Sequence, residues 1–293
     1  MSKIREYFTS RWDTGYIAEY DFSQLEVIAL AHLSQDKNLI ADIKAGVDMH
    51  CQSASFLYNV DYSDIYHAYK AGDEKWTKRR KISKAPGFLI QYGGGAKAMA
   101  KATGLSEGQC KGFIDNYYKR YTGVKAFQEA VMKEVKKSRE MKGNSRTEAG
   151  LPSGTGMYVS ETGRRYSFKE YDGFHNDTSF SPTQMKNYPV QGFATGDIVP
   201  MVLGKLYRVL KNDSVLSDEC LLINTVHDSV VFDVKDEGVL RYADRIIRQT
   251  MEDAPRYLKE TFGINFDLEL PVDGEAGRNW LHMEPVDRII LPF

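Results

Sequence analysis

The pattern of apolar and polar positions predicts strands near both ends of the chain. Residues 15–21, which read Gly-Tyr-Ile-Ala-Glu-Tyr-Asp, indicate a short strand ending in a carboxylate. Residues 23–33 follow as an apolar helix. Two apolar, β-branched runs at 221–226 and 230–234 flank His227-Asp228-Ser229 and predict two strands joined by a tight turn.

Between these strands the pattern is mainly helical. Residues 45–150 carry helical periodicity, and Ser106 followed by Gln109 forms a capping box at the start of one helix. Gly123 is predicted to end that helix. A further helix is expected from residue 187 to about residue 211. The chain therefore predicts a strand-containing frame interrupted by a long helical insertion.

Charge is distributed unevenly along the 293 residues, although the net charge is only -1. Residues 61–150 hold 19 Lys and Arg against 10 Asp and Glu, whereas the remaining residues hold 20 against 30. A basic block in an acidic frame favours a polyanion bound on one face, and a solvated helical face explains it equally well.

Composition excludes several classes of protein. Three scattered cysteines, Cys51, Cys110 and Cys220, form neither a disulfide framework nor a cluster with metal-ligand spacing. The N-terminus lacks the apolar core of a signal peptide, and apolar runs such as 27–33 are too short to cross a bilayer. We therefore expect a cytoplasmic protein without structural zinc or a membrane span.

Two carboxylates stand at the ends of predicted strands. Asp21 ends the first strand, and Asp228 lies at the tip of the hairpin. If these ends meet, the pair suits Mg²⁺, which binds one or two carboxylates and completes its shell with water and substrate phosphates. An Asp at a turn is usually only a turn residue, so each Asp alone is weak evidence for a metal site.

A second group recurs every four residues in the basic block. Arg80, Lys84, Phe88 and Tyr92 form one slanting stripe on a helix, with two cations followed by two rings. Such a stripe suits a nucleoside triphosphate, although an amphipathic helix with basic residues at one end gives the same spacing. Pro86 predicts a kink or break between Lys84 and Phe88.

Together these motifs resemble the nucleotidyl-transfer domain of family A DNA polymerases, the group of bacterial DNA polymerase I. The first, second and third motifs of that family are matched in order by Asp21-Phe-Ser-Gln-Leu-Glu26, by residues 80–93 and by His227-Asp228-Ser229. Four minor similarities lie at 48–50, 121–124, 187–192 and 277–280.

The resemblance implies a role for each matching position. Two Mg²⁺ ions would be held by the carboxylates of Asp21 and Asp228 and the backbone carbonyl of Phe22. The incoming dNTP would be bound by a larger set, namely Gln24, Glu26, His50, Arg80, Lys84, Phe88 and Tyr92. In this set Glu26 would exclude a ribose 2′-hydroxyl. Primer-template DNA would be contacted by Asn187, Gln191 and His227.

The implied fold is α+β, a palm built on an antiparallel sheet with helical fingers inserted. The palm would comprise residues 1–43 and 156–293, including a tail at 281–293, and the fingers residues 44–155. Thumb and exonuclease domains are absent from the match. We therefore expect a second polypeptide to supply them, as in a split viral polymerase acting in the host cytoplasm.

The chain departs from the family pattern at several positions, including Pro86 within the second motif. Ser229 stands where the family usually has Glu after the catalytic Asp, which predicts tuning rather than loss of activity. Thr183 stands where the bacterial enzymes often carry Arg. Two alternatives remain, a non-catalytic nucleic-acid-binding replisome subunit and an enzyme like the single-subunit RNA polymerases. Glu26 argues against the second, because a 2′-hydroxyl must fit there.

Overall fold

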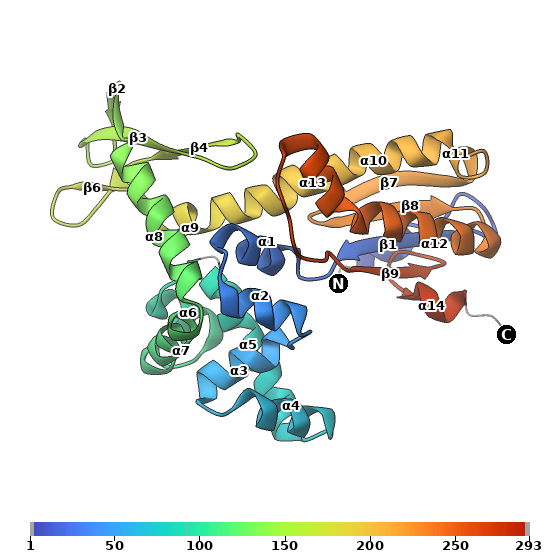
Figure 1. Ribbon diagram of the computed structural model, residues 1–293, viewed down its shortest axis with the longest axis horizontal. Helices are drawn as coiled ribbons and strands as arrows, with labels where there is room; N and C mark the ends of the chain where they lie inside the picture. Colours follow the sequence, from blue (N-terminus) through green and yellow to red (C-terminus); the bar gives the residue numbers. More distant parts are fainter. Residues whose placement is uncertain (1–2, 92, 291–293) are drawn as a thin grey trace. The chain divides into compact units, whose positions relative to one another are not determined.

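The computed structural model of the chain describes residues 3–91 and 93–290 and divides into two compact units (Figure 1). The first unit combines the residues up to Glu26 with those from Gly192 onward. The second runs from Val27 to Gln191. The mixture of helices with antiparallel sheets confirms the α+β prediction.

The first unit is built on a five-stranded antiparallel sheet in the order β10-β9-β1-β8-β7. Its strands are β1 (Tyr16–Phe22), β7 (Cys220–Val226), β8 (Ser229–Val234), β9 (Val272–Gly277) and β10 (Glu284–Pro285). Its helical segments are η1 (Lys3–Tyr7), η2 (Gly192–Ile198, π-helical), α10 (Val199–Asn212), α11 (Leu216–Glu219), α12 (Glu237–Glu252), α13 (Ala254–Phe262) and α14 (Val286–Ile289).

Alternation along β1 gives this sheet two different faces. Tyr20 lies on one face, where it packs edge-on against Phe232 with ring centroids 5.8 Å apart, and α12 lies against the strands. On the other face Ile17, Val231 and Trp280 form a small apolar cluster. Because side chains alternate across a strand, Glu19 and Asp21 share the face of Ile17. Apolar packing therefore fixes one end of that face and leaves the carboxylate end of β1 accessible.

Both ends of the chain are attached to this sheet. Ser10 Oγ and Arg11 Nε donate to the buried carboxylate of Asp233 on β8 at 2.6 and 2.9 Å. Near the C-terminus β10 pairs with β9, and Val286 of α14 is fully buried. The predicted tail at 281–293 thus packs on the sheet as far as α14, and residues 291–293 lie outside the described range.

The second unit is mainly helical, as the periodicity predicted. Its helices are α1 (Leu25–Ser34, spanning the unit boundary), α2 (Lys37–Lys44), α3 (Met49–Tyr58), α4 (Tyr62–Lys70), α5 (Glu74–Gln91), α6 (Ala96–Thr103), α7 (Glu107–Arg120), α8 (Thr122–Lys137) and α9 (Pro182–Gln191). Its strands are β2 (Glu140–Arg146), β3 (Pro152–Val159), β4 (Arg165–Lys169), β5 (Tyr171–Asp172) and β6 (Thr178–Ser179).

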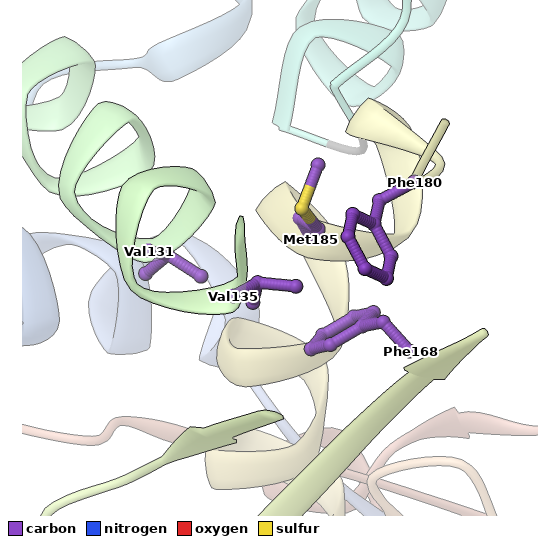
Figure 2. Close-up of a cluster of buried hydrophobic side chains, with 5 residues drawn as sticks. All are labelled: Val131, Val135, Phe168, Phe180 and Met185. Carbon is purple, nitrogen blue, oxygen red and sulfur yellow. The ribbon is translucent and has the colours of Figure 1, made fainter. Parts of the chain in front are cut away.

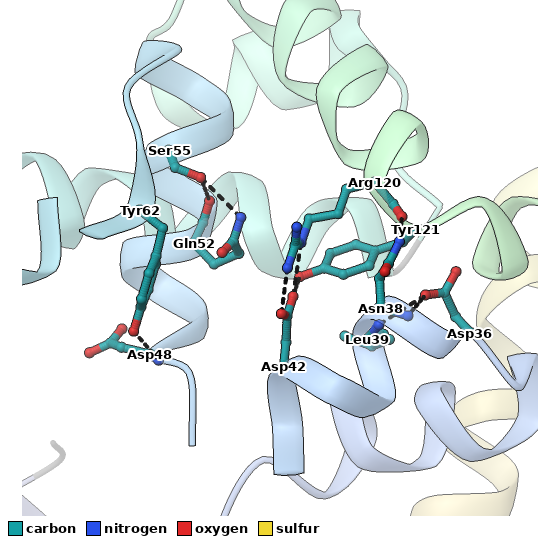
Figure 3. A network of polar contacts seen from close by, with 10 residues as sticks. All are labelled: Asp36, Asn38, Leu39, Asp42, Asp48, Gln52, Ser55, Tyr62, Arg120 and Tyr121. Atoms are coloured by element: carbon teal, nitrogen blue, oxygen red, sulfur yellow. Dashed lines mark hydrogen bonds and ion pairs between the residues drawn. The ribbon is translucent and has the colours of Figure 1, made fainter. Parts of the chain in front are cut away.

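Buried carboxylates tie these helices together (Figure 3). Asp42 of α2 accepts from Arg120 Nε at 2.9 Å and from the Tyr121 hydroxyl at 2.7 Å. Asp36 caps α2 and also accepts from the backbone N–H of Gly123 at 2.6 Å. These charged hydrogen bonds fix α2 against the junction of α7 and α8.

At the junction of α7 and α8 the structure differs from the prediction that Gly123 ends a helix. The capping box of Ser106 and Gln109 is present, but α7 ends at Arg120, and Gly123 lies in the first turn of α8. Gly123 is needed there for space, since a Cβ atom would lie 2.9 Å from the Cα of Asp36. The prediction that Gly123 ends the helix is therefore wrong, because close packing rather than a helix stop requires the glycine.

A second correction concerns Pro86. Helix α5 continues from Glu74 to Gln91, so the predicted break is wrong, whereas the alternative, a kink, stays a prediction. Pro86 and Gly87 are buried, and a Cβ atom on Gly87 would lie 2.7 Å from Ser53 Oγ of α3. Packing against α3 therefore offsets the roughly 3 kcal/mol that an interior proline costs.

A separate apolar cluster joins α8, α9 and β4 at the far end of this unit. It consists of Val131, Val135, Phe168, Phe180 and Met185, all of which point toward one another in Figure 2. Beside the cluster, Arg139 and the backbone N–H of Gly154 donate to the buried carboxylate of Glu170. The second unit thus has its own core, separate from that of the sheet in the first unit.

The predicted helix from residue 187 to about 211 is confirmed, although helical structure begins earlier, at Pro182. It passes through the π-helical segment η2. Within residues 3–91 and 93–290, no helix is both long and apolar enough to cross a membrane.

The contact of Gly87 with Ser53 gives a test of the α3–α5 packing. An exposed helical Gly→Ala substitution stabilises by about 1 kcal/mol, and we expect this at Gly112 of α7, where a Cβ atom would meet nothing within 4 Å. Gly87→Ala must displace the Ser53 hydroxyl from its bond to the Met49 carbonyl, which costs about 1–3 kcal/mol. Chemical denaturation should show Gly87→Ala to be less stable than Gly112→Ala by about that amount.

The Ser53→Ala background supplies the control. Without the hydroxyl, Gly87→Ala should stabilise almost as much as Gly112→Ala. Equal effects of Gly87→Ala in both backgrounds would contradict the close contact.

Candidate functional site

The two strand-end carboxylates meet, as the sequence predicted. Asp21, the penultimate residue of β1, lies directly opposite Ser229 of β8. Ser229 also pairs with Val226, so His227 and Asp228 form a two-residue turn. The Asp21 carboxyl lies close enough to Asp228 for the charge of Asp228 to raise its pKa. Sheet register therefore brings together two groups 207 positions apart in the sequence.

Backbone strain marks the turns on both sides of this pair. His227 and Gln24 have φ values of 59° and 58°, in the left-handed region that non-glycine residues rarely adopt. Each such residue costs on the order of 1 kcal/mol or more and persists only where surrounding structure holds it. Such strain is concentrated at functional sites, which is consistent with the roles predicted for both turns.

The electrostatics of the pair are unfavourable for two free carboxylates. Burial, followed by the charge and hydrogen bond of Asp228, raises the pKa of Asp21 from 3.8 to about 7. The charges of Glu19 and Asp273 contribute in the same direction. Protonation of Asp21 relieves the repulsion between these carboxylates, and a bound cation would relieve the same repulsion.

Asp273 is a site residue that the motif analysis missed. It lies opposite Asp21 on β9, with Ser229 on the other side in β8, and Ser23 Oγ donates to its carboxylate. Glu275, two residues later, lies opposite Glu19. The alternation Val-Asp-Gly-Glu at 272–275 could have indicated two acidic side chains on one face of a strand.

These residues fit a magnesium site that is completed by substrate. Among the residues that the structure describes, no three His, Cys, Asp or Glu side chains could hold a metal ion by themselves. Mg²⁺ uses one or two protein carboxylates together with water and substrate phosphates. The carboxylates of Asp21 and Asp228, with the nearby carbonyl of Phe22, match that donor set.

A second group of predicted residues comes together on α3 and α5. The pKa of His50 is lowered by burial and then by the charges of Lys84 and Arg80. The ring of His50 lies 6.0 Å from that of Phe88, which is 47% exposed. The structure thus places one imidazole, two cations and an exposed ring on neighbouring helices of the second unit.

Arg80 is held in place by Asp48, another residue without a predicted role. The Asp48 carboxylate accepts a hydrogen bond from Arg80 Nη2 at 2.8 Å and caps α3 by accepting from the backbone N–H groups of His50 and Cys51. Burial alone would raise the pKa of Asp48, but these hydrogen bonds lower it below its usual value. Arg80 also lies over the ring of Tyr69 at 4.6 Å. Its guanidinium is therefore oriented before any ligand binds.

The remaining predicted residues lie in both units. Gln24 and Glu26 belong to the first unit, Glu26 in the first turn of α1, and His227 is exposed at the tip of the β7–β8 turn. Asn187 and Gln191 face one another near the end of α9, with Nδ2 and Oε1 3.5 Å apart. Tyr92 lies outside the described residues.

The repulsion at Asp21 gives a pH-dependent prediction. Because the folded pKa of about 7 exceeds the unfolded value of 3.8, the metal-free protein is most stabilised by Asp21 below pH 3.8 and loses that stability as the pH rises to about 7. Asp21→Asn does not titrate. Its melting temperature in EDTA should therefore exceed that of the wild type by a margin that grows between about pH 4 and pH 8.

Mg²⁺ provides the control for this measurement. Because the ion should stabilise only the wild type, it should reduce the difference in melting temperature between Asp21→Asn and the wild type at high pH. A margin that is the same at all pH values would contradict the repulsion.

Comparison with known proteins places the chain in a family. A family profile described as DNA polymerase family A matches residues 1–282. DNA polymerase I of Lactococcus lactis subsp. cremoris is 28% identical over 279 residues, and so is that of Bacillus subtilis. Each match covers 95% of this chain but 27% of the relative, so the chain spans about a quarter of these proteins.

A solved structure agrees in fold. The polymerase domain of Pol1 from M. smegmatis, in complex with DNA primer-template and dNTP, is similar with a TM-score of 0.66 and 22% identity. The match covers 94% of this chain and 42% of that one. The three motifs, the fold and the profile match agree, and the chain belongs to DNA polymerase family A.

Proposed function

We propose that this chain is a DNA-directed DNA polymerase, which joins a templated dNTP to a primer 3′-hydroxyl. The observation that carries the proposal is the meeting of Asp21 and Asp228 at the end of one sheet in a family A chain. The similar Pol1 domain from M. smegmatis binds primer-template and dNTP, which supports the same ligands here.

Nucleotidyl transfer joins the primer 3′-oxygen to the α-phosphorus of the dNTP and releases pyrophosphate. Two bound Mg²⁺ ions would supply activation of the attacking oxygen and stabilisation of the leaving group. Asp21, Asp228 and the carbonyl of Phe22 would hold them. The protein's own contribution is positioning and fixed charge, without a covalent enzyme intermediate.

The cationic group on α5 is proposed to bind the triphosphate. Arg80 and Lys84 would face the phosphates, with His50 and Gln24 as further hydrogen-bonding partners. Asp48 supports this role, because it uses Arg80 Nε and one terminal nitrogen and leaves the other nitrogen for a phosphate oxygen. His50, whose pKa is lowered, would be neutral near pH 7 and act through hydrogen bonds rather than charge.

Contacts to the sugar, base and DNA complete the proposal. Glu26 would occupy the space of a ribose 2′-hydroxyl, and the exposed ring of Phe88, with Tyr92, would face the sugar and the templating base pair. Asn187, Gln191 and His227 would contact primer-template DNA near the primer end.

In family terms, we propose residues 1–43 and 156–293 as palm and 44–155 as fingers. Outside the basic block at 61–150, acidic residues outnumber basic ones by 30 to 20. Duplex binding depends largely on cationic phosphate contacts. We therefore propose that a second polypeptide provides further grip on the DNA, as a thumb with an exonuclease.

Loss of one catalytic carboxylate should abolish activity and preserve the fold. Asp228→Asn should lower the single-nucleotide incorporation rate by a hundredfold to a thousandfold or more, roughly the effect of removing one preorganised electrostatic group. Asp218→Asn, on the exposed surface of α11, is the matched control and should retain full activity. Near-normal primer extension by Asp228→Asn, with unchanged circular dichroism, would refute the assignment.

Substitution of Glu26 tests the choice of sugar. Glu26→Ala should raise ribonucleotide incorporation by about tenfold to a hundredfold, the scale at which a shape-based pocket discriminates, with little gain for dNTPs. Glu26→Gln, which keeps the side-chain volume, should retain discrimination. Comparing kcat/KM for dNTP and rNTP decides the matter, and equal discrimination by Glu26→Ala and the wild type would exclude a steric role for Glu26.

A further inference from the structure

Ser229, which replaces the glutamate expected from the family pattern, contacts the side chain of Glu19. Ser229 stands one position after Asp228, where the family pattern has a carboxylate, and is only 5% exposed. Its hydroxyl lies 2.7 Å from Glu19 Oε1 and 3.0 Å from the carbonyl of Val226. A carboxylate is therefore present beside position 229, but it comes from β1.

The second oxygen of Glu19 is also held. Trp280 Nε1 donates to Glu19 Oε2 at 2.7 Å, and Arg5 Nη1 lies 3.7 Å from the same oxygen. The guanidinium of Arg5 also lies over the Trp280 ring at 4.2 Å from its centroid. Both carboxylate oxygens thus have partners, and the Glu19 side chain, 19% exposed, has one defined orientation.

Sheet register places Glu19 beside the metal-binding pair. Glu19 and Asp21 are two residues apart on β1 and share a face, while Ser229 lies opposite Asp21. Asp273 and Glu275 on β9 lie opposite Asp21 and Glu19 on the same face, and Asp233 at the other end of β8 is bound by Ser10 and Arg11. Glu19 on β1 and Ser229 on β8 are the residues beside the Asp21–Asp228 pair, and only Glu19 can carry a negative charge.

We propose that Glu19 is a positioning residue for the Asp21–Asp228 site and supplies from β1 the negative charge that the third motif lacks at Ser229. The proposal rests on the proposed function and names a residue that the family motifs do not include. Glu19 acts in two ways, by attracting the cations through its charge and by fixing Ser229, and with it the turn that carries Asp228. Arg5 weakens the charge only in part, because its contact is long and 26% of its side chain is exposed.

The two actions are separated by different substitutions. Glu19→Gln removes the charge and keeps both hydrogen bonds, since an amide can accept from Trp280 and donate to the Ser229 hydroxyl. Ser229→Ala keeps the charge and removes one hydrogen bond. Glu19→Ser combined with Ser229→Glu moves the carboxylate to the position that the family pattern predicts.

Mn²⁺ binding to the full-length chain, measured by electron paramagnetic resonance of free Mn²⁺, is the primary measurement. Glu19→Gln should weaken binding about tenfold, the lower end of the effect of losing a group that supports metal ligands. Ser229→Ala should weaken it less, and Glu275→Gln, which removes a charge from the same face, should change it by about threefold or less. The double variant should bind more tightly than Glu19→Ser alone.

Primer extension across a range of Mg²⁺ concentrations provides the second measurement. The Mg²⁺ concentration at half-maximal rate should rise in Glu19→Gln by the same factor as the Mn²⁺ dissociation constant. The melting temperature should not fall, because loss of this charge relieves the repulsion from Glu275 and Asp21. Unchanged Mn²⁺ affinity in Glu19→Gln, or a double variant no better than Glu19→Ser, would overturn the proposal. If the wild type binds Mn²⁺ but adds no nucleotide, the proposed function fails and the Mn²⁺ titration alone decides the role of Glu19.

Discussion

Electrostatic repulsion at the end of one sheet is the constraint on which the candidate site depends. Like charges directly opposite one another in neighbouring strands are destabilising, yet Asp21 faces Asp273 and Glu19 faces Glu275. The β7–β8 turn adds Asp228 to the same end. Without a bound cation, this repulsion only destabilises the fold. Apolar packing of the opposite face of the sheet against α12 offsets that loss of stability.

The rest of the first unit can be understood as support for these charges. Asp233 binds Ser10 and Arg11, Trp280 binds Glu19, and Arg278 donates to the backbone carbonyl of Gly15 at 2.9 Å. These contacts attach the segments before β1 and after β9 to the central strands. Positions that must hold repelling groups are thereby fixed by hydrogen bonds on several sides, as preorganised sites require.

The second unit applies the same principle to a cation. Arg80 would be a long, mobile side chain on an exposed helix, but Asp48 and Tyr69 hold its guanidinium from two sides. Asp48 owes its own position to the start of α3, where two backbone N–H groups bind it. One carboxylate therefore connects a helix terminus to the proposed phosphate-binding residue.

Motif spacing and periodicity were sufficient to predict the strands β1, β7 and β8 and the capping box at Ser106, whereas the meeting of Asp21 with Asp228 was implied by the resemblance to the family. They failed where tertiary packing decides, since Gly123 and Pro86 act as helix breakers only when nothing packs against them. They gave no role to Asp273, Glu19 or Asp48, because these residues act through cross-strand register or through hydrogen bonds to residues distant in the sequence. Local pattern does not encode such pairings.

The most direct test of the account is single-nucleotide addition by the purified chain to a primer on each of four templates, with each dNTP and each rNTP in turn. Mg²⁺-dependent addition of only the complementary dNTP, absent in EDTA and much slower with any rNTP, is the predicted result. Addition of rNTPs at equal or greater rates would indicate an RNA polymerase. DNA binding without any addition would indicate a non-catalytic subunit and contradict the role of the paired carboxylates.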